Sequence, residues 1–112
     1  MDIIEISGRR IRRQTLKEEL ARLGIEPTDA SDSDFAVGCL LSPASSVQIQ
    51  ILRDLGMELL TPPSEVQFAA RFDGGDLHLI GALRFIDWVL VFPDEVLPAF
   101  GLTRSALDAL QA

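Results

Sequence analysis

The order of apolar and polar positions along the chain predicts short strands separated by short helices. An apolar run over residues 35–41 indicates a buried strand, and shorter apolar runs near 2–6, 57–60 and 88–92 predict further strands. Residues 9–13 fit either a short strand or a loop. Polar and turn-forming residues separate these runs.

A β-hairpin over residues 65–84 is the most specific prediction of this pattern. Along residues 66–72, the apolar side chains at 66, 68, 70 and 72 alternate with those at 67, 69 and 71, as expected for a half-buried strand. The Asp-Gly-Gly-Asp sequence at 73–76 supplies a tight turn, because glycine tolerates positive φ angles. In the resulting register, Phe72 lies opposite Leu77 on the apolar face.

A first helix is expected over residues 16–23. Thr15 and Glu18 have the spacing of a capping box, in which each side chain accepts a hydrogen bond from the other residue's backbone N–H. Apolar residues recur on one face of this helix. Gly24 follows as a left-handed residue that ends it.

A second helix is expected over residues 43–55, with Ser42 as N-cap and Pro43 at the first helical position. A short C-terminal helix should begin after Thr103. Residues 82–90 could form a strand or an amphipathic helix. We favour a strand there, because aromatic and β-branched residues dominate.

Together these elements predict an α+β fold for a single domain over residues 1–112. A mostly antiparallel sheet from the 65–92 region, joined by strands near 2–6 and 35–41, would carry both main helices on one face. The expected core combines the apolar face of the hairpin with the inner faces of the helices: Val66, Phe68, Phe72, Leu77, Leu79, Leu16, Leu20, Leu23, Val47, Ile51 and Leu55.

Charge is unevenly distributed. The chain has a net charge of −7, but residues 1–22 carry six basic and four acidic side chains. Residues 23–112 carry four basic and thirteen acidic side chains, a net charge of −9. Such an acidic body favours a partner with a basic surface and disfavours nucleic acid, whose phosphates must be neutralised by Lys and Arg.

Two short segments in the last quarter of the chain carry a resemblance that leaves this conclusion about nucleic acid unchanged. Residues 89–95 and 101–107 resemble the strand and the second-helix opening of ribbon-helix-helix DNA-binding proteins. Those proteins read the major groove with polar or basic side chains, whereas residues 89–92 are all apolar. Because of this departure, we do not expect DNA binding.

Groups suited to catalysis are scarce. The chain has a single Cys39, a single His78 and no Tyr. Cys39 lies in an apolar run without a basic neighbour, so we expect a buried, inert thiol. His78 would share a strand face with Asp76, which leaves an Asp–His pair as a minor possibility. We therefore expect no catalytic residue, no cofactor and no metal, and no enzyme activity.

Charged clusters are the remaining candidates, and we expect them to contact a partner. The loop at 29–34 is acidic, but it lacks the central glycine and terminal glutamate of a calcium loop. The Arg9–Arg13 segment is the one basic cluster, suited to phosphates or an acidic partner. The candidate partner-binding residues are Asp29, Asp32, Asp34, Asp73, Asp76, Arg9, Arg10, Arg12 and Arg13.

The sequence thus predicts a non-enzymatic protein that binds a partner protein as an inhibitor, immunity-type protein, chaperone or adaptor. A self-assembling accessory subunit, for example a homodimer, is the alternative. A small-ligand binder that uses His78 with Asp76 and a nucleic-acid mimic are less favoured. A single cysteine and the lack of a membrane-length apolar run suggest a cytoplasmic protein.

Overall fold

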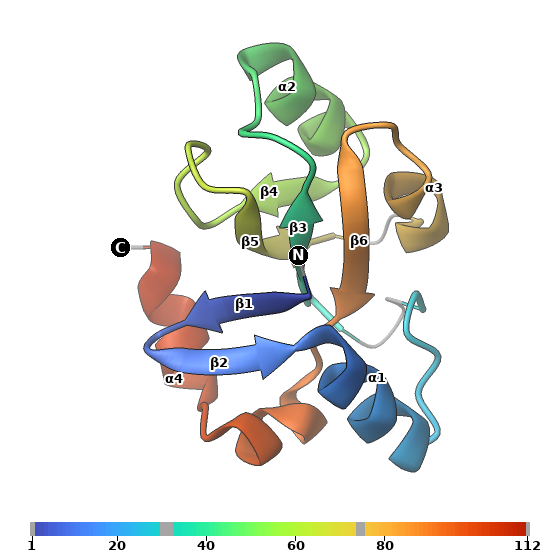
Figure 1. Ribbon diagram of the computed structural model, residues 1–112, viewed down its shortest axis with the longest axis vertical. Helices are drawn as coiled ribbons and strands as arrows, with labels where there is room; N and C mark the ends of the chain where they lie inside the picture. The colour runs from blue at the N-terminus through green and yellow to red at the C-terminus, as the bar shows by residue number, and fades with distance from the viewer. Residues whose placement is uncertain (1, 30–32, 74–75, 112) are drawn as a thin grey trace.

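Two antiparallel sheets organise the chain (Figure 1). The computed structural model describes residues 2–29, 33–73 and 76–111. The larger sheet has the strand order β4-β5-β3-β6, and β1 pairs with β2 in a separate two-stranded sheet. The strands are β1 Ile3–Ile6, β2 Arg9–Arg12, β3 Phe35–Leu40, β4 Met57–Leu59, β5 Gln67–Phe72 and β6 Ile86–Val91.

Helices flank both sheets. The α-helices are α1 Arg13–Arg22, α2 Ser46–Asp54, α3 Leu77–Gly81 and α4 Arg104–Asp108. Two 3-10 helices, η1 Asp94–Phe100 and η2 Ala109–Gln111, precede and follow α4. This arrangement confirms the α+β class and the short C-terminal helix. The Thr103 side chain caps α4 as expected, because it accepts a hydrogen bond from Ala106 N.

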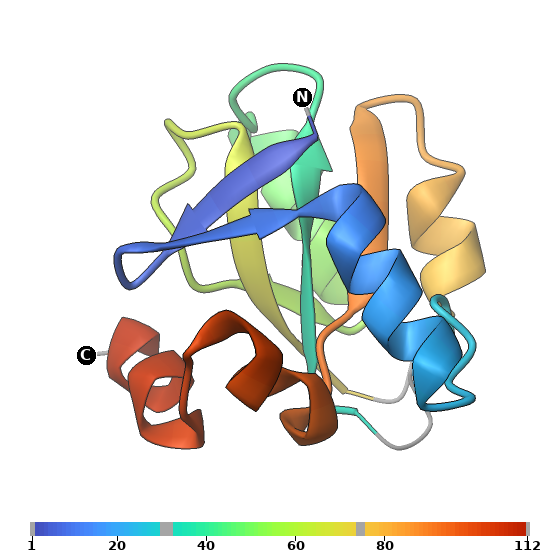
Figure 2. The same cartoon turned by 60° about the horizontal axis from the view of Figure 1, so that its bottom comes forward.

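The central strand β3 is buried along its whole length, because both faces of the large sheet are covered. One face contacts the small sheet, where Glu5 N donates to Gln67 Oε1 (2.9 Å). The other face contacts α3, where Gly81 approaches Val89. Figure 2 shows β1, β2 and α1 in front of the large sheet and α2 behind it.

Gly38 lets β3 lie close to its neighbours. A Cβ atom at this position would overlap the backbone oxygen of Trp88 and lie 2.9 Å from Phe68 Cζ. Only glycine therefore fits at position 38 of β3, between β5 and β6, without moving the backbone.

Most strands expected from the sequence are present. Apolar runs correctly indicated β1, β3, β4 and β6, and the basic segment after β1 is a strand rather than a loop. Residues 86–91 are a strand, as we favoured over a helix. Although β6 is an edge strand, the side chains of Trp88, Val89, Leu90 and Val91 are all buried, so β6 differs from an exposed DNA-reading ribbon.

The expected hairpin over 65–84 is wrong in its second arm. Leu77–Gly81 forms the helix α3, so Phe72 does not pair with Leu77. The buried side chains there are Leu77 and Ile80, three residues apart, and Leu79 is 51% exposed. This spacing fits a helix face rather than alternation along a strand. The strand β5 instead pairs with β3 and β4.

Both helix starts expected from the sequence are also wrong. The helix α1 begins at Arg13, immediately after β2 and without a side-chain cap, so Thr15 and Glu18 do not form a capping box. The helix α2 begins at Ser46 and not at Pro43. Its N-cap is Ser45, whose Oγ accepts from Gln48 N (3.2 Å) while Gln48 Oε1 accepts from Ser45 N (3.0 Å).

Helix placement differs from the expectation too. We expected the two main helices on one face, but α1 and α2 lie on opposite sides of the large sheet (Figure 2). Leu16 and Leu20 are buried as expected, whereas Val47 is 68% exposed. The small sheet covers the area that a second helix would need.

Candidate functional site

Strand order brings several acidic residues to one end of the large sheet. Because β3 is antiparallel to β5 and β6, its start lies beside their ends. Asp34 precedes β3, Asp73 follows β5, and Asp94 lies shortly after β6. Backbone hydrogen bonds join these segments: Phe72 N donates to the oxygen of Asp34 (2.8 Å), and Phe92 N donates to that of Phe35 (2.9 Å).

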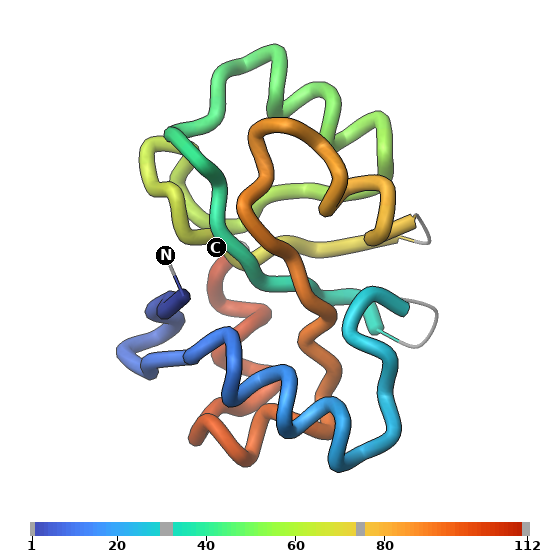
Figure 3. The backbone as a smooth tube through the Cα atoms, turned by 45° about the vertical axis from the view of Figure 1, so that its right-hand side comes forward, coloured from blue at the N-terminus to red at the C-terminus, as the bar shows by residue number. Residues whose placement is uncertain are grey.

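Two further acidic residues of these connections lie at the same end. Val91 N donates to the backbone oxygen of Pro27 (2.9 Å), which places the loop carrying Asp29 beside the end of β6 (Figure 3). Asp76 begins α3, and its carboxylate accepts from His78 N (2.9 Å). We call this surface the acidic end, with the exposed residues Asp29, Asp34, Asp73, Asp76, Asp94 and Glu95. The candidate Asp32 lies outside the described residues.

A hollow of about 350 Å3 marks the acidic end. Three carboxylate side chains border it, those of Glu26, Asp29 and Glu95. Pro93 and Ile25 add apolar wall. A hollow with carboxylates at its rim and apolar wall suits a basic side chain, whose methylene stem packs against apolar surface while its charge stays at the rim.

Arg104 is the main cation of the acidic end. Its guanidinium hydrogen-bonds the Asp34 carboxylate through two nitrogens, donates to Asp94 Oδ1 (3.1 Å) and donates to Asp108 Oδ1 (3.3 Å). It also lies over the Phe35 ring, 4.4 Å from the centroid. The hydrogen bond from Arg104 lowers the pKa of Asp34, and partial burial opposes this shift. The same bond raises the pKa of Arg104.

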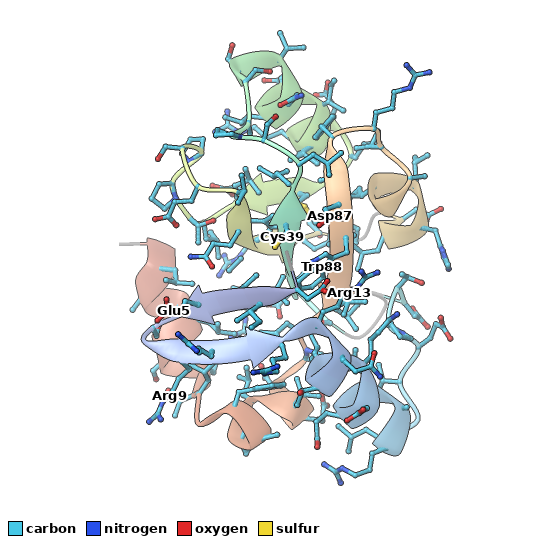
Figure 4. The ribbon with its side chains drawn as sticks, in the orientation of Figure 1. Glu5, Arg9, Arg13, Cys39, Asp87 and Trp88 are labelled. Carbon is cyan, nitrogen blue, oxygen red and sulfur yellow. The ribbon has the colours of Figure 1, made fainter. Side chains whose placement is uncertain are left out.

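A second charged surface lies on the small sheet. Arg9, Arg10 and Arg12 project from β2 and are exposed. They border a groove of about 510 Å3 together with Thr15, Ala99, Phe100 and Gly101. We call this feature the arginine groove. Figure 4 shows Arg9 at the outer end of the β1–β2 hairpin.

The fourth residue of the predicted basic cluster has a different environment. Arg13 lies over the Trp88 ring, 5.6 Å from its centroid, and its Nη1 is 3.9 Å from Asp2 Oδ1. Figure 4 shows its side chain beside Trp88, away from Arg9. The structure therefore separates Arg13 from the arginine groove.

His78 and Cys39 lie in different places and do not form a reactive pair. Nε2 of His78 is 2.8 Å from Thr28 Oγ1, so the ring hydrogen-bonds a hydroxyl. The Asp76 carboxylate contacts the backbone N–H of His78 and caps α3. Cys39 is fully buried, and this burial raises the pKa of its thiol. The thiolate is therefore disfavoured at neutral pH.

Sequence reasoning missed Arg104 and the groove around Gly101. Thr103 indicated a helix start, but nothing local connects Arg104 with Asp34, seventy residues earlier. The two residues meet only because β3 starts where β6 ends. Likewise, Gly101 completes the arginine groove from the far end of the chain.

The described residues also bear on metal sites and on membrane insertion. Across 2–29, 33–73 and 76–111, no group of three or more His, Cys, Asp or Glu side chains is placed to hold a metal ion. No helix in the same ranges is long and apolar enough to cross a membrane.

Among known proteins, no family model, curated sequence or solved structure matches this chain.

Proposed function

We propose that this protein binds a partner protein with a basic surface through the acidic end. The observation that carries this proposal is the gathering of exposed carboxylates from three connecting segments, before β3, after β5 and after β6, at one end of the sheet. Complementary charge accelerates the encounter of two proteins and favours one relative orientation. An inhibitor, immunity-type protein, chaperone or adaptor would act in this way.

The carboxylates of the acidic end are not equally available. Asp34 and Asp94 already accept hydrogen bonds from Arg104, and Asp76 caps α3. Asp73 and Glu95 have no side-chain partner among the residues that the structure describes. We therefore assign these two to the contact with a partner, while Asp34, Asp76 and Asp94 shape the surface and add to its negative field.

The test is capture of partners from the native host at low and at high salt. We expect the wild-type chain to retain a basic protein at low salt and to release it at high salt, because salt screens exposed charges. The double variant Asp73→Lys with Glu95→Lys should lose this protein. A matched variant, Glu18→Lys with Glu65→Lys, has the same net charge but changes positions outside the acidic end, and it should keep the partner. Equal capture by both variants would contradict the proposal.

Self-association remains a second candidate function, supported by exposed apolar side chains. Leu41 is 64% exposed, Val47 is 68% exposed and Leu79 is 51% exposed. A homodimer could bury such side chains. Light scattering at micromolar concentration tests this candidate: a dimer that the variant Val47→Ser converts to a monomer would support it, and a wild-type monomer would remove it.

A further inference from the structure

The arginines of the groove lack the partners that other arginines of this chain have. Arg22 contacts Glu19 (2.7 Å), and Arg104 contacts Asp34, Asp94 and Asp108. Within the described part of the chain, no carboxylate forms an ion pair with Arg9, Arg10 or Arg12. This is notable in a protein with a net charge of −7. Three neighbouring cations repel one another, so an anion among them would be stabilised.

The backbone at Gly101 contributes to the shape of the groove. Gly101 has a φ of +68°, a conformation that glycine adopts at low cost. A Cβ atom here would lie 3.3 Å from Arg9 Cζ, because the guanidinium rests against the glycine. Gly101 therefore lets Arg9 lie along the wall of the groove, close to the half-buried ring of Phe100.

We propose that the arginine groove binds a small molecule that carries a phosphate group. Guanidinium groups match phosphate oxygens with paired hydrogen bonds, and a phosphate or diphosphate brings more negative charge than a single carboxylate. The volume of about 510 Å3 lies within the usual range of small-molecule sites, so there is room for an organic part beside the phosphate. The Thr15 hydroxyl is a further donor, and Phe100 offers an apolar contact.

This proposal does not depend on the acidic end. The groove lies on β2 and at the C-terminal end of η1, whereas the acidic end lies at the start of β3 and at the N-terminal end of η1. Loss of either function can therefore be observed while the other is retained.

The test is an NMR titration of the full chain at low salt with three probes: pyrophosphate, ATP and citrate. We expect saturable shifts of backbone amides at 9–15 and 99–101 with pyrophosphate and ATP, and weaker binding of citrate. The variants Arg9→Ala and Arg12→Ala should each weaken pyrophosphate binding about tenfold or more. The matched variants Arg53→Ala and Arg84→Ala remove exposed arginines elsewhere and should leave binding unchanged.

The variant Phe100→Leu distinguishes the contribution of the phosphate to binding from that of the organic part of the ligand. This variant keeps an apolar side chain but removes the ring, so it should weaken ATP binding more than pyrophosphate binding if the base contacts Phe100. Equal effects on both probes would restrict the proposal to the phosphate group alone.

Three results would overturn the proposal. The first is no saturation by about 10 mM pyrophosphate, which corresponds to negligible affinity. The second is shifts as large around Arg53 and Arg84 as around the groove, which would indicate unspecific screening. The third is tighter binding of citrate than of pyrophosphate, which would make the groove a carboxylate site. Circular dichroism of each variant establishes that its fold is intact.

Discussion

Around Arg104, one guanidinium pairs with three carboxylates, one of which (Asp108) also lies 4.0 Å from Arg71, whereas in the arginine groove no carboxylate of the described chain pairs with any of the three guanidiniums. The first region joins the start of β3 to α4 through hydrogen bonds and through the ring of Phe35. The second region contains no such connection. Identical side chains thus have a structural role in one region and remain available for a ligand in the other.

The number of charged residues is therefore a poor guide to a binding surface. The acidic cluster predicted from the sequence includes Asp34 and Asp76, which the structure uses for an ion pair and a helix cap. What counts for binding is the charge left after internal partners are assigned. By this measure Asp73, Glu95 and the groove arginines are the exposed charges to test first.

The largest effect on stability is expected for Arg104→Leu. This change removes the cation that pairs with Asp34 and Asp94, leaves Asp108 with Arg71 alone at 4.0 Å, and removes the contact with the Phe35 ring. Because the side chains are partly exposed, we expect a loss of about 1–2 kcal/mol in the free energy of unfolding, measured by urea denaturation. The control Arg84→Leu should change it by less than about 0.5 kcal/mol. An equal, small loss in both variants would remove the structural role of Arg104.

Gly101→Ala should have the next largest effect and act on both stability and the groove. A left-handed conformation costs a non-glycine residue about 1 kcal/mol, and the new Cβ would press on the Arg9 guanidinium. We expect a loss of about 1 kcal/mol together with weaker pyrophosphate binding. Gly24→Ala is the matched control, because Gly24 has a φ of +72° with no neighbour near an added Cβ. It should lose similar stability and keep pyrophosphate binding, and a loss of binding in the control would contradict this account.

The pH dependence of stability tests the Asp34–Arg104 pair more finely. Arg104 lowers the pKa of Asp34 in the folded state. The contribution of the pair is therefore fully present above the unfolded-state pKa of about 3.9, and it is lost as pH falls through the lower folded-state pKa. Because the Asp34 side chain is 53% exposed, solvent screening limits this contribution to less than about 1 kcal/mol.

The measurement is urea denaturation of wild type and of Asp34→Asn between pH 7 and pH 2. The advantage of the wild type should be constant down to about pH 4 and then shrink as the carboxylate is protonated. An advantage that does not change with pH would show that the Asp34 charge contributes nothing.

The smallest effect on stability is expected in the arginine groove itself. Arg10→Gln and Arg12→Gln should each change the free energy of unfolding by less than about 0.5 kcal/mol, because neither arginine forms an ion pair with a residue that the structure describes. Added pyrophosphate should raise the melting temperature of the wild type and not that of a variant lacking both arginines. A large loss of stability in either single variant would show that these arginines have a structural role after all.

The sequence predicted those elements that depend on local pattern. The apolar runs at 35–41 and 88–92, which lie in β3 and β6, are each continuous, so the sequence predicts their strand character. The segment after Asp76 was misread, because leucines at 77 and 79 fit alternation as well as Leu77 and Ile80 fit a helix. Asp76 is itself a good N-cap, and this was the signal that favoured the helix.

The candidate sites were predictable only as lists of charged residues. Their grouping depends on the strand order β4-β5-β3-β6, in which β5 is inserted beside β3 instead of pairing with the segment that follows it. Short segments do not encode such long-range pairing, so the meeting of Asp34 with Arg104 could not be foreseen. For the same reason, the separation of Arg13 from its three neighbours required the structure.

The rate of association with the captured partner tests the role of the acidic end most directly. At low salt, we expect the double variant Asp73→Lys with Glu95→Lys to associate about tenfold or more slowly than wild type, because attraction becomes repulsion. The matched variant Glu18→Lys with Glu65→Lys should be slowed much less, and the difference between the two variants should shrink at high salt. Equal association rates for both variants at low salt would contradict docking of the partner on the acidic end.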